Sequence, residues 1–568
     1  MLSDRRRGLR SVRGALRSPA RGALALAALA WAAAAPSSAQ PFVFYRSIFN
    51  AASFAPSGAP HGAVAQGSIF TVFGRGLGPA AGASAQSFPL EQTLAGVSLE
   101  VCQAETCAAA LPLFVRSDQI NAVMPSNAPL GASSLRVTVD GVAGNFSPVT
   151  VAAAGFGVFA VNSGGFGPGI VQNFVASADT PLNSAVAAAR PGQPLILWGT
   201  GLGPVATPDR LPAEAGDLPT AVEISVGGRP VSVLRYSGRA PGFSGLDQIV
   251  FDLPADAPSG CYVPVTLRVG DAPSNTVTIA VSPDGSPCAD PSNPFDPARS
   301  GGATGVVLLT RALWEAPLPV GFSITADIVS GLFQNEPAGP WRFNRLYSLP
   351  PPGACTAYAF NEGRPSLRYF AGLARPGAAL SAGERLDVDA AAGQGSALAV
   401  PALADLYSGF VGTSAALDPA LALIFGESAG ASVSAPGGAD VGAFSVDIAG
   451  PPAFSWSNRE VAQSLRPGQP LTLEWTGGDP GGLVVIAGFT KSEAQLASSA
   501  FVCAARADQG RFTVPALSTA ALVRDGQTLI GKLVLAAARP AADPFQAPGL
   551  AQGLGLFVAA AQEDVLVP

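Results

Sequence analysis

A segment that occurs twice in the sequence constrains the fold of this chain more than any other feature. Residues 66–79 read QGSIFTVFGRGLGP, and residues 191–204, at an offset of 125 residues, read PGQPLILWGTGLGP. Two further matches follow at an offset of 129 residues: Asp118–Ile120 with Asp247–Ile249, and Ala128–Gly131 with Ala257–Gly260. Because the three matches keep their order and nearly their spacing, they indicate a duplicated domain with a small change in length.

Both copies consist of short runs rich in β-branched residues, separated by turn residues. Glycine (66) and proline (52) together make up about a fifth of the 568 residues, which is typical of many turns between short strands. No amphipathic helical pattern interrupts the runs, so each copy is predicted to be an antiparallel sandwich of about 100 residues. The predicted strands are 68–73, 97–101, 135–139 and 148–151 in the first copy, and 195–198, 222–226, 231–234, 263–269 and 276–281 in the second.

Several strings of the first copy carry a resemblance to a known family: Asn50–Ser53, the Phe73-Gly74 turn up to Leu77, Leu94–Val97 and Asp118–Asn121. Together they resemble the uncharacterised C-terminal domain of many secreted acidobacterial proteins, which is related to immunoglobulin-like IPT/TIG domains. The resemblance covers residues 47–155 well and 156–283 more loosely, since Val250 stands where the first copy has Asn121. It implies an exported, immunoglobulin-like sandwich and supplies no catalytic residue and no ligand.

The glycine cluster Gly74–Pro79 superficially matches a phosphate-binding loop. That chemistry needs a following helix whose N-terminus points at the phosphate, and the sixth position here is Pro79 rather than glycine. The cluster is therefore predicted to be a tight turn in which glycine adopts a positive φ.

Residues 1–39 are predicted to be a cleaved signal peptide. Seven arginines precede the apolar run 23–35, and small residues at Ser37 and Ala39 fit cleavage before Gln40. Thirteen residues span about 20 Å as a helix, too little to cross a membrane of about 30 Å, so no stable membrane insertion is expected. The segment carries a net charge of +6, so its removal changes the total from −6 to −12, and no basic cluster remains to bind nucleic acid.

Six cysteines remain after cleavage, and an even number in an exported chain favours disulfides. Fifteen connectivities are possible, of which nearest-neighbour pairing within domains is the simplest. It joins Cys102 with Cys107, Cys261 with Cys288, and Cys355 with Cys503. A zinc site is not predicted, because the chain has no C-x-x-C motif and one histidine only.

The chain is predicted to be all-β, with tandem immunoglobulin-like sandwiches after the signal peptide. The predicted divisions are 1–39 (signal peptide), 40–155 and 156–283 (the first and second repeat), 284–304 (linker), 305–449 (β-rich module) and 450–568 (sandwich, or one unit with 305–449). Strings such as Cys355-Thr356, 437–442, 454–456 and 512–515 resemble another β-rich extracellular module of the same bacterial group. Asp290 and Asp296 of the linker are too few carboxylates to predict a calcium site.

One motif matches a hydrolase signature. Gly426–Gly430 fits G-x-S-x-G, the nucleophile elbow of carboxylesterases, with Ser428 as the nucleophile. Its base is a histidine downstream, but the single histidine, His61, lies upstream in another domain, and no His-Gly-Gly-Gly segment is present. The motif is therefore interpreted as a turn. No carboxylate pair stands out for glycoside hydrolysis, and Lys491 is interpreted as part of a solvated loop.

Tryptophans are the remaining candidates for ligand contact. Trp198, Trp456 and Trp475 lie in or beside predicted strands and are expected in the core. Trp314 and Trp341 lie in less regular sequence, and the core is favoured for them by a smaller margin. We therefore expect a noncatalytic secreted or cell-surface protein that binds or scaffolds, without catalytic residues, cofactor or metal, and with an extracellular protein or a glycan as partner. Two alternatives stay open: carbohydrate binding or a cryptic hydrolase within 305–568, and a subunit of a surface assembly joined through sheet edges.

Overall fold

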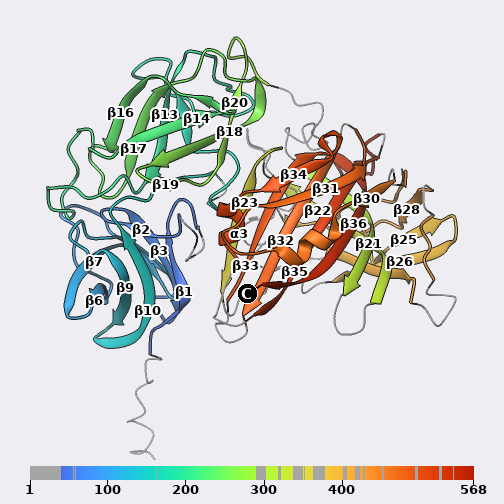
Figure 1. Ribbon diagram of the computed structural model, residues 1–568, viewed down its shortest axis with the longest axis horizontal. Coiled ribbons are helices and arrows are strands. Elements are labelled where there is room, and N and C mark those ends of the chain that lie inside the picture. The colour runs from blue at the N-terminus through green and yellow to red at the C-terminus, as the bar shows by residue number, and fades with distance from the viewer. Residues whose placement is uncertain are drawn as a thin grey trace, which may run out of the picture. The chain divides into compact units, whose positions relative to one another are not determined.

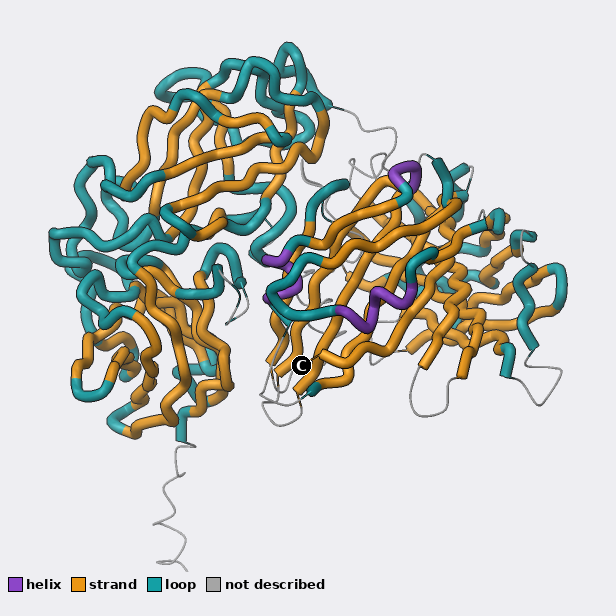
Figure 2. Tube along the Cα trace, in the orientation of Figure 1, coloured by secondary structure: helices purple, strands orange, loops and turns teal. Residues whose placement is uncertain are grey.

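The computed structural model contains strands almost throughout (Figures 1 and 2). It describes residues 40–55, 57, 59, 61–161, 163–288, 302–316, 322–336, 350, 352–361, 378–400, 406–415, 422–426, 429–450, 453–480, 482–492, 497–522, 528–541 and 543–567. The helices among these residues are the short α3 (Ala516–Ala520), η4 (Arg459–Ser464) and η5 (Ala507–Gln509). No helix in the described part of the chain has the length and hydropathy of a membrane span. The fold is all-β, and the predicted signal peptide lies outside the described residues.

The first repeat is one sheet that folds over on itself. Its order is β1-β3-β8-β7-β6-β9-β10-β2, with β4 beside β7 and β5 beside β6. The first half of β7 pairs with β6 and its second half with β8, so β7 belongs to both layers around one apolar core. The strands are β1 (Phe42–Asn50), β2 (Val64–Ala65), β3 (Ile69–Arg75), β4 (Ala83–Ser84), β5 (Thr93–Leu94), β6 (Val97–Gln103), β7 (Thr106–Arg116), β8 (Gln119–Val123), β9 (Gly131–Val139) and β10 (Val142–Ala152).

The second repeat has two separate sheets, ordered β11-β13-β17-β16 and β15-β14-β18-β19, with β12 beside β13 and β20 beside β18. Apolar residues of both sheets form one core, so the repeat is a sandwich that resembles an immunoglobulin-like domain. The strands are β11 (Gly157–Val158), β12 (Val171–Asn173), β13 (Pro194–Thr200), β14 (Val222–Val226), β15 (Arg229–Pro230), β16 (Leu234–Arg239), β17 (Asp247–Asp252), β18 (Gly260–Val269), β19 (Ala272–Pro273) and β20 (Val277–Val281).

The matched segments of the two repeats form the same strand pair. Phe73 of β3 lies opposite Gln119 of β8, and Trp198 of β13 lies opposite Gln248 of β17. The offsets of 125 and 129 residues relate these two pairs to each other. The sequence duplication is therefore also a duplication of strand register.

The C-terminal region contains a 13-stranded sheet, ordered β23-β33-β32-β35-β36-β21-β22-β27-β26-β25-β28-β29 with β24 beside β22, and a small sheet β30-β31-β34. Its strands are β21 (Gly302–Ala316), β22 (Phe322–Glu336), β23 (Cys355–Asn361), β24 (Ala378–Ala379), β25 (Arg385–Ala390), β26 (Gly393–Val400), β27 (Leu406–Thr413), β28 (Ala431–Ala435), β29 (Phe444–Ile448), β30 (Phe454–Trp456), β31 (Leu471–Gly477), β32 (Leu483–Ser492), β33 (Ala497–Arg506), β34 (Arg511–Val514), β35 (Leu529–Pro540) and β36 (Gln552–Val567).

The last strand of the chain, β36, pairs in parallel with β21, the first strand of this region. Two apolar cores lie along the sheet, one against β25–β29 and one against the small sheet. This pairing is the arrangement expected if 305–449 and 450–568 form one unit.

Two local predictions are wrong. Residues 231–233 are not a strand, because the chain there crosses from the sheet of β15 to the sheet of β16, which starts at Leu234. Lys491 is exposed, as expected, but it lies in β32 rather than in a loop. The predicted glycine turns are present: Gly76 has a φ of 65°, and Gly201 and Gly203 in the second repeat have φ values of 114° and 126°.

Candidate functional site

A buried ion pair lies where the second repeat meets the first. Arg239 ends β16 and Asp247 begins β17, and the two residues are direct neighbours across this antiparallel pair. Their side chains are 3% and 0% exposed. A pair so completely removed from water requires further partners for its remaining donors and acceptors.

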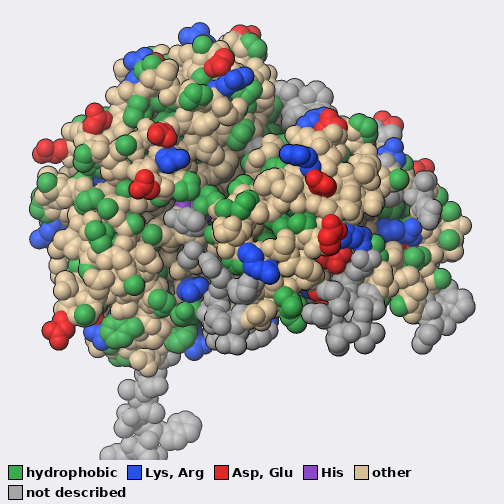
Figure 3. Space-filling view, viewed as in Figure 1, with side chains coloured by type: hydrophobic (Ala, Val, Ile, Leu, Met, Phe, Trp, Pro, Cys, Tyr) green, Lys and Arg blue, Asp and Glu red, His purple; other side chains and the backbone are tan. Residues whose placement is uncertain are grey.

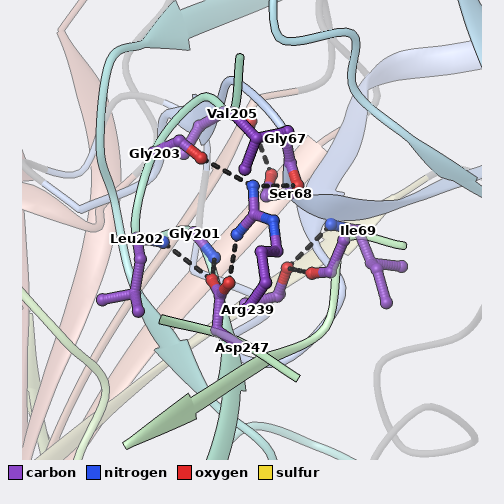
Figure 4. A network of polar contacts seen from close by, with 12 residues as sticks. Gly67, Ser68, Ile69, Gly201, Leu202, Gly203, Val205, Arg239 and Asp247 are labelled. Carbon is purple, nitrogen blue, oxygen red and sulfur yellow. Dashed lines mark hydrogen bonds and ion pairs between the residues drawn. The ribbon is translucent and has the colours of Figure 1, made fainter. Parts of the chain in front are cut away.

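Backbone groups of both repeats supply those partners (Figure 4). Asp247 Oδ2 accepts hydrogen bonds from the amides of Gly201 (2.6 Å) and Leu202 (2.8 Å). Arg239 Nη1 donates to Asp247 Oδ1, while Nη2 donates to the carbonyl oxygens of Gly203 (2.6 Å) and Gly67 (2.8 Å). The guanidinium therefore fastens the glycine turn of its own repeat and one residue of the first repeat.

The electrostatic balance of this pair depends on its partners. Burial raises the pKa of the Asp247 carboxyl, and the Arg239 guanidinium and the amides of Leu202 and Gly201 oppose that shift. Removing one of these partners leaves a carboxylate in a site that disfavours its charge.

Asn50 and Thr200 extend the network. Asn50 is 2% exposed, and its Nδ2 donates to the carbonyl oxygens of Gly155 and Thr200, both at 3.1 Å. Thr200 Oγ1 donates to the Gly245 carbonyl (2.6 Å) and accepts from the Ile69 amide (2.8 Å). We call Asn50, Thr200, Arg239 and Asp247 the junction network. Asn50 belongs to one of the strings that carry the family resemblance.

The C-terminal region contains a second ion pair, of which only the aspartate is fully buried. Arg311 of β21 and Asp327 of β22 are cross-strand neighbours, and Asp327 is fully buried. Asp327 Oδ2 accepts from the amides of Ile424 and Phe425, both at 2.9 Å, and Arg311 Nη2 donates to the Phe425 carbonyl. This pair holds the residues that directly precede the G-x-S-x-G match. Glu427 and Ser428 lie outside the described residues.

The six cysteines form the three predicted disulfides: Cys102–Cys107, Cys261–Cys288 and Cys355–Cys503. The first and third join residues that are direct cross-strand neighbours. Glu100 lies close to Cys102 and Cys107, but the disulfide takes up both thiols, so no thiolate ligand is left there for a metal. Asp290 and Asp296 lie outside the described residues.

The tryptophans differ in burial. Trp456 and Trp475 are each 3% exposed and lie in the core, as predicted. Trp198 is half-buried, and its indole N–H donates to Gln172 Oε1 at 2.8 Å. Trp314 is 37% exposed; its indole N–H donates to Asp564, and the Lys532 ammonium lies 4.8 Å from its ring centroid. Trp341 lies outside the described residues.

The single histidine is in the first repeat. Burial lowers the pKa of the His61 imidazole to about 4, and its buried Nδ1 has no hydrogen-bond partner among the residues that the structure describes. The ring is therefore neutral at pH 7.

Sequence reasoning did not find the junction network. Asp247 belongs to a segment that is repeated in the sequence, but the repeat gives no reason to pair it with Arg239. The strand that carries Arg239 was predicted at 231–234, ahead of its true position, so the sequence did not place the two residues opposite each other. The sequence does contain a usable signal: an arginine and an aspartate at the two ends of a short connection between apolar runs. Such a pattern predicts a cross-strand ion pair.

No family model matches this chain, and no curated protein matches it. Among solved structures, it is similar to plexin A4 (full extracellular region; 14% identity, 44% of this chain and 19% of that chain, TM-score 0.16). It is also similar to domains 5–6 of the S-layer protein SbsC (14% identity, 42% and 98%, TM-score 0.16). SGBP-B from a xyloglucan utilization locus in Bacteroides uniformis matches at 10% identity (65% and 86%, TM-score 0.15). The chain spans about a fifth of the plexin A4 chain that it matches.

Proposed function

We propose that this chain is a noncatalytic exported protein with a binding or scaffolding role, in which the two repeats, members of the IPT/TIG-like family they resemble, act as one rigid unit. The junction network carries the proposal. A guanidinium that is 3% exposed and donates to both repeats resists separation, because opening the junction would expose an ion pair and leave backbone carbonyls without donors. The three disulfides support export to an oxidising compartment.

Hydrogen exchange on the mature chain tests the rigidity. We expect the amides of Ile69, Gly201 and Leu202, which donate to side chains of the junction network, to exchange as slowly as amides in the centre of the sheets. Exchange at the rate of surface loops would contradict a rigid junction.

A panel of ester and glycoside substrates tests the absence of catalysis. We expect no turnover by the mature chain. Turnover that disappears in Ser428→Ala would overturn the proposal and favour the alternative of a hydrolase within 305–568.

Glycan binding at Trp314 is the other form of that alternative. The exposed indole favours it, but the Lys532 ammonium occupies one side of the ring. If Trp314 forms a glycan site, Trp314→Ala should abolish glycan binding by the chain. If the function proposed here is right, the same substitution should leave any glycan binding unchanged.

A further inference from the structure

Three aromatic rings on the outer surface of the first repeat each lie against an arginine. Three cation–π pairs lie there, with guanidinium-to-centroid distances of 4.6 Å for Arg75 and Phe42, 4.7 Å for Arg136 and Phe146, and 5.4 Å for Arg46 and Tyr45. We call Phe42, Phe44, Tyr45, Phe146 and these three arginines the aromatic–arginine surface.

Side-chain hydrogen bonds from β10 to the backbone of β1 bring the two strands together. Asn145 of β10 accepts from the Val43 amide (2.8 Å) and donates to the Val43 carbonyl (2.9 Å), while Ser147 Oγ donates to the Phe44 carbonyl (3.1 Å). Phe146, between Asn145 and Ser147, is therefore level with β1 residues 43 and 44. Figure 3 shows apolar and basic side chains side by side at the lower end of this repeat.

The rings are open to solvent although a guanidinium covers one side. Phe146 is 55% exposed and Tyr45 is 40% exposed. Phe42 and Phe44 are half-buried and pack edge to face at 6.2 Å, which fixes their orientation.

Part of the positive charge has no internal partner. Arg136 forms an ion pair with Glu100, but neither Arg46 nor Arg75 forms an ion pair among the described residues. The mature chain is expected to carry a net charge of −12, so binding of an anion at this surface depends on the local charge of Arg46 and Arg75. Charge complementarity selects an anionic ligand.

We propose that the aromatic–arginine surface binds an acidic polysaccharide, with pyranose faces stacked on Tyr45 and Phe146 and carboxylates held by Arg46 and Arg75. Guanidinium matches carboxylate bidentately, and aromatic rings match the C–H faces of sugars. The inference rests on the binding role proposed above.

Binding of the mature full-length chain to polygalacturonate, with dextran as the neutral control, tests this proposal. We expect binding to polygalacturonate alone, weakened as sodium chloride rises from about 50 mM to about 500 mM. Phe146→Ala and Arg75→Gln should each weaken binding by about tenfold.

Matched controls lie on the second repeat. Phe243 is as exposed as Phe146, at 55%, and Arg268 is 61% exposed, so Phe243→Ala and Arg268→Gln make the same changes of area and charge elsewhere. Their affinity should stay within about twofold of the unmodified chain. Equal losses in all four variants, or no binding to polygalacturonate, would overturn the proposal. Binding to phosphatidylglycerol vesicles in place of polygalacturonate would instead identify an anionic membrane surface. None of these results changes the substrate-panel or hydrogen-exchange tests of the proposed function.

Discussion

Lowering the pH from 7 to 4 should destabilise the first repeat through its single histidine. The pKa of His61 falls from the ordinary 6.5 to about 4 because burial disfavours the charged ring. Above pH 6.5 the ring is neutral in both the folded and the unfolded state, so the contribution to stability is fully present. As the pH falls from 6.5 towards 4, the unfolded state takes up a proton that the folded state does not, and stability is lost.

The size of this loss follows from the shift. A difference of about 2.5 pH units, at about 1.36 kcal/mol each, gives up to about 3 kcal/mol of unfolding free energy. The loss should level off below about pH 4, where the folded state also takes up the proton. Because a typical domain is stable by only about 5–15 kcal/mol, this is a large fraction.

Proton NMR gives the direct measurement, since one histidine contributes one imidazole C2 proton. We expect that resonance to titrate near pH 4 in the folded chain. Urea denaturation followed by segment-resolved hydrogen exchange then gives the stability of the first repeat at each pH. The control is His61→Gln, which keeps every carboxylate, so the difference between the two proteins isolates the histidine. A folded-state pKa near 6.5, or identical pH profiles for the two proteins, would refute the reasoning.

Arg239→Met leaves the Asp247 carboxylate buried without its counter-ion, and urea denaturation should show a loss of about 3–5 kcal/mol; R239M/D247N, which removes the charge and keeps an acceptor for the Gly201 and Leu202 amides, should recover part of it, and a neutral single variant would contradict the network. Asp327→Ala removes the acceptor of two loop amides, so hydrogen exchange at residues 424 and 425 should accelerate; unchanged protection would show that the loop needs no such anchor. The Cys355–Cys503 disulfide spans 148 residues, and replacing both cysteines with serine should cost up to about 5 kcal/mol on the chain-entropy estimate, visible as a lower melting temperature; equal melting temperatures would count against this contribution.

Strands with one buried face were predictable from the sequence. Residues 222–226 were placed correctly at both ends, because short apolar alternation between turn residues marks them. The disulfides followed from an even number of cysteines and the separation between domains.

The long strands of the C-terminal region were not predictable in the same way. In β21, residues Val306 to Leu309 are apolar on both sides, and Val307 and Leu309 enter one core while Val306 packs against Leu554 and Leu556 on the other face. A strand covered on both faces loses the alternation that identifies it. Its parallel pairing with β36 joins residues about 250 positions apart, and no local pattern encodes such a contact.

The junction network shows where a repeat match stops being informative. Asp118 and Asp247 occupy the same position of the duplicated motif, yet the Asp118 side chain is 42% exposed and pairs with Arg116, two residues earlier in the chain. Asp247 is fully buried and pairs with Arg239, whose second amino group reaches Gly67 of the other repeat. The local sequence of each copy determines its backbone register, and the two copies have the same register. The environment of a side chain comes from whatever packs over the strand, and at Asp247 that includes the other copy. Duplication therefore repeats a strand pair without repeating the electrostatics of its residues, so a buried ion pair can arise in one copy while its counterpart stays in contact with water.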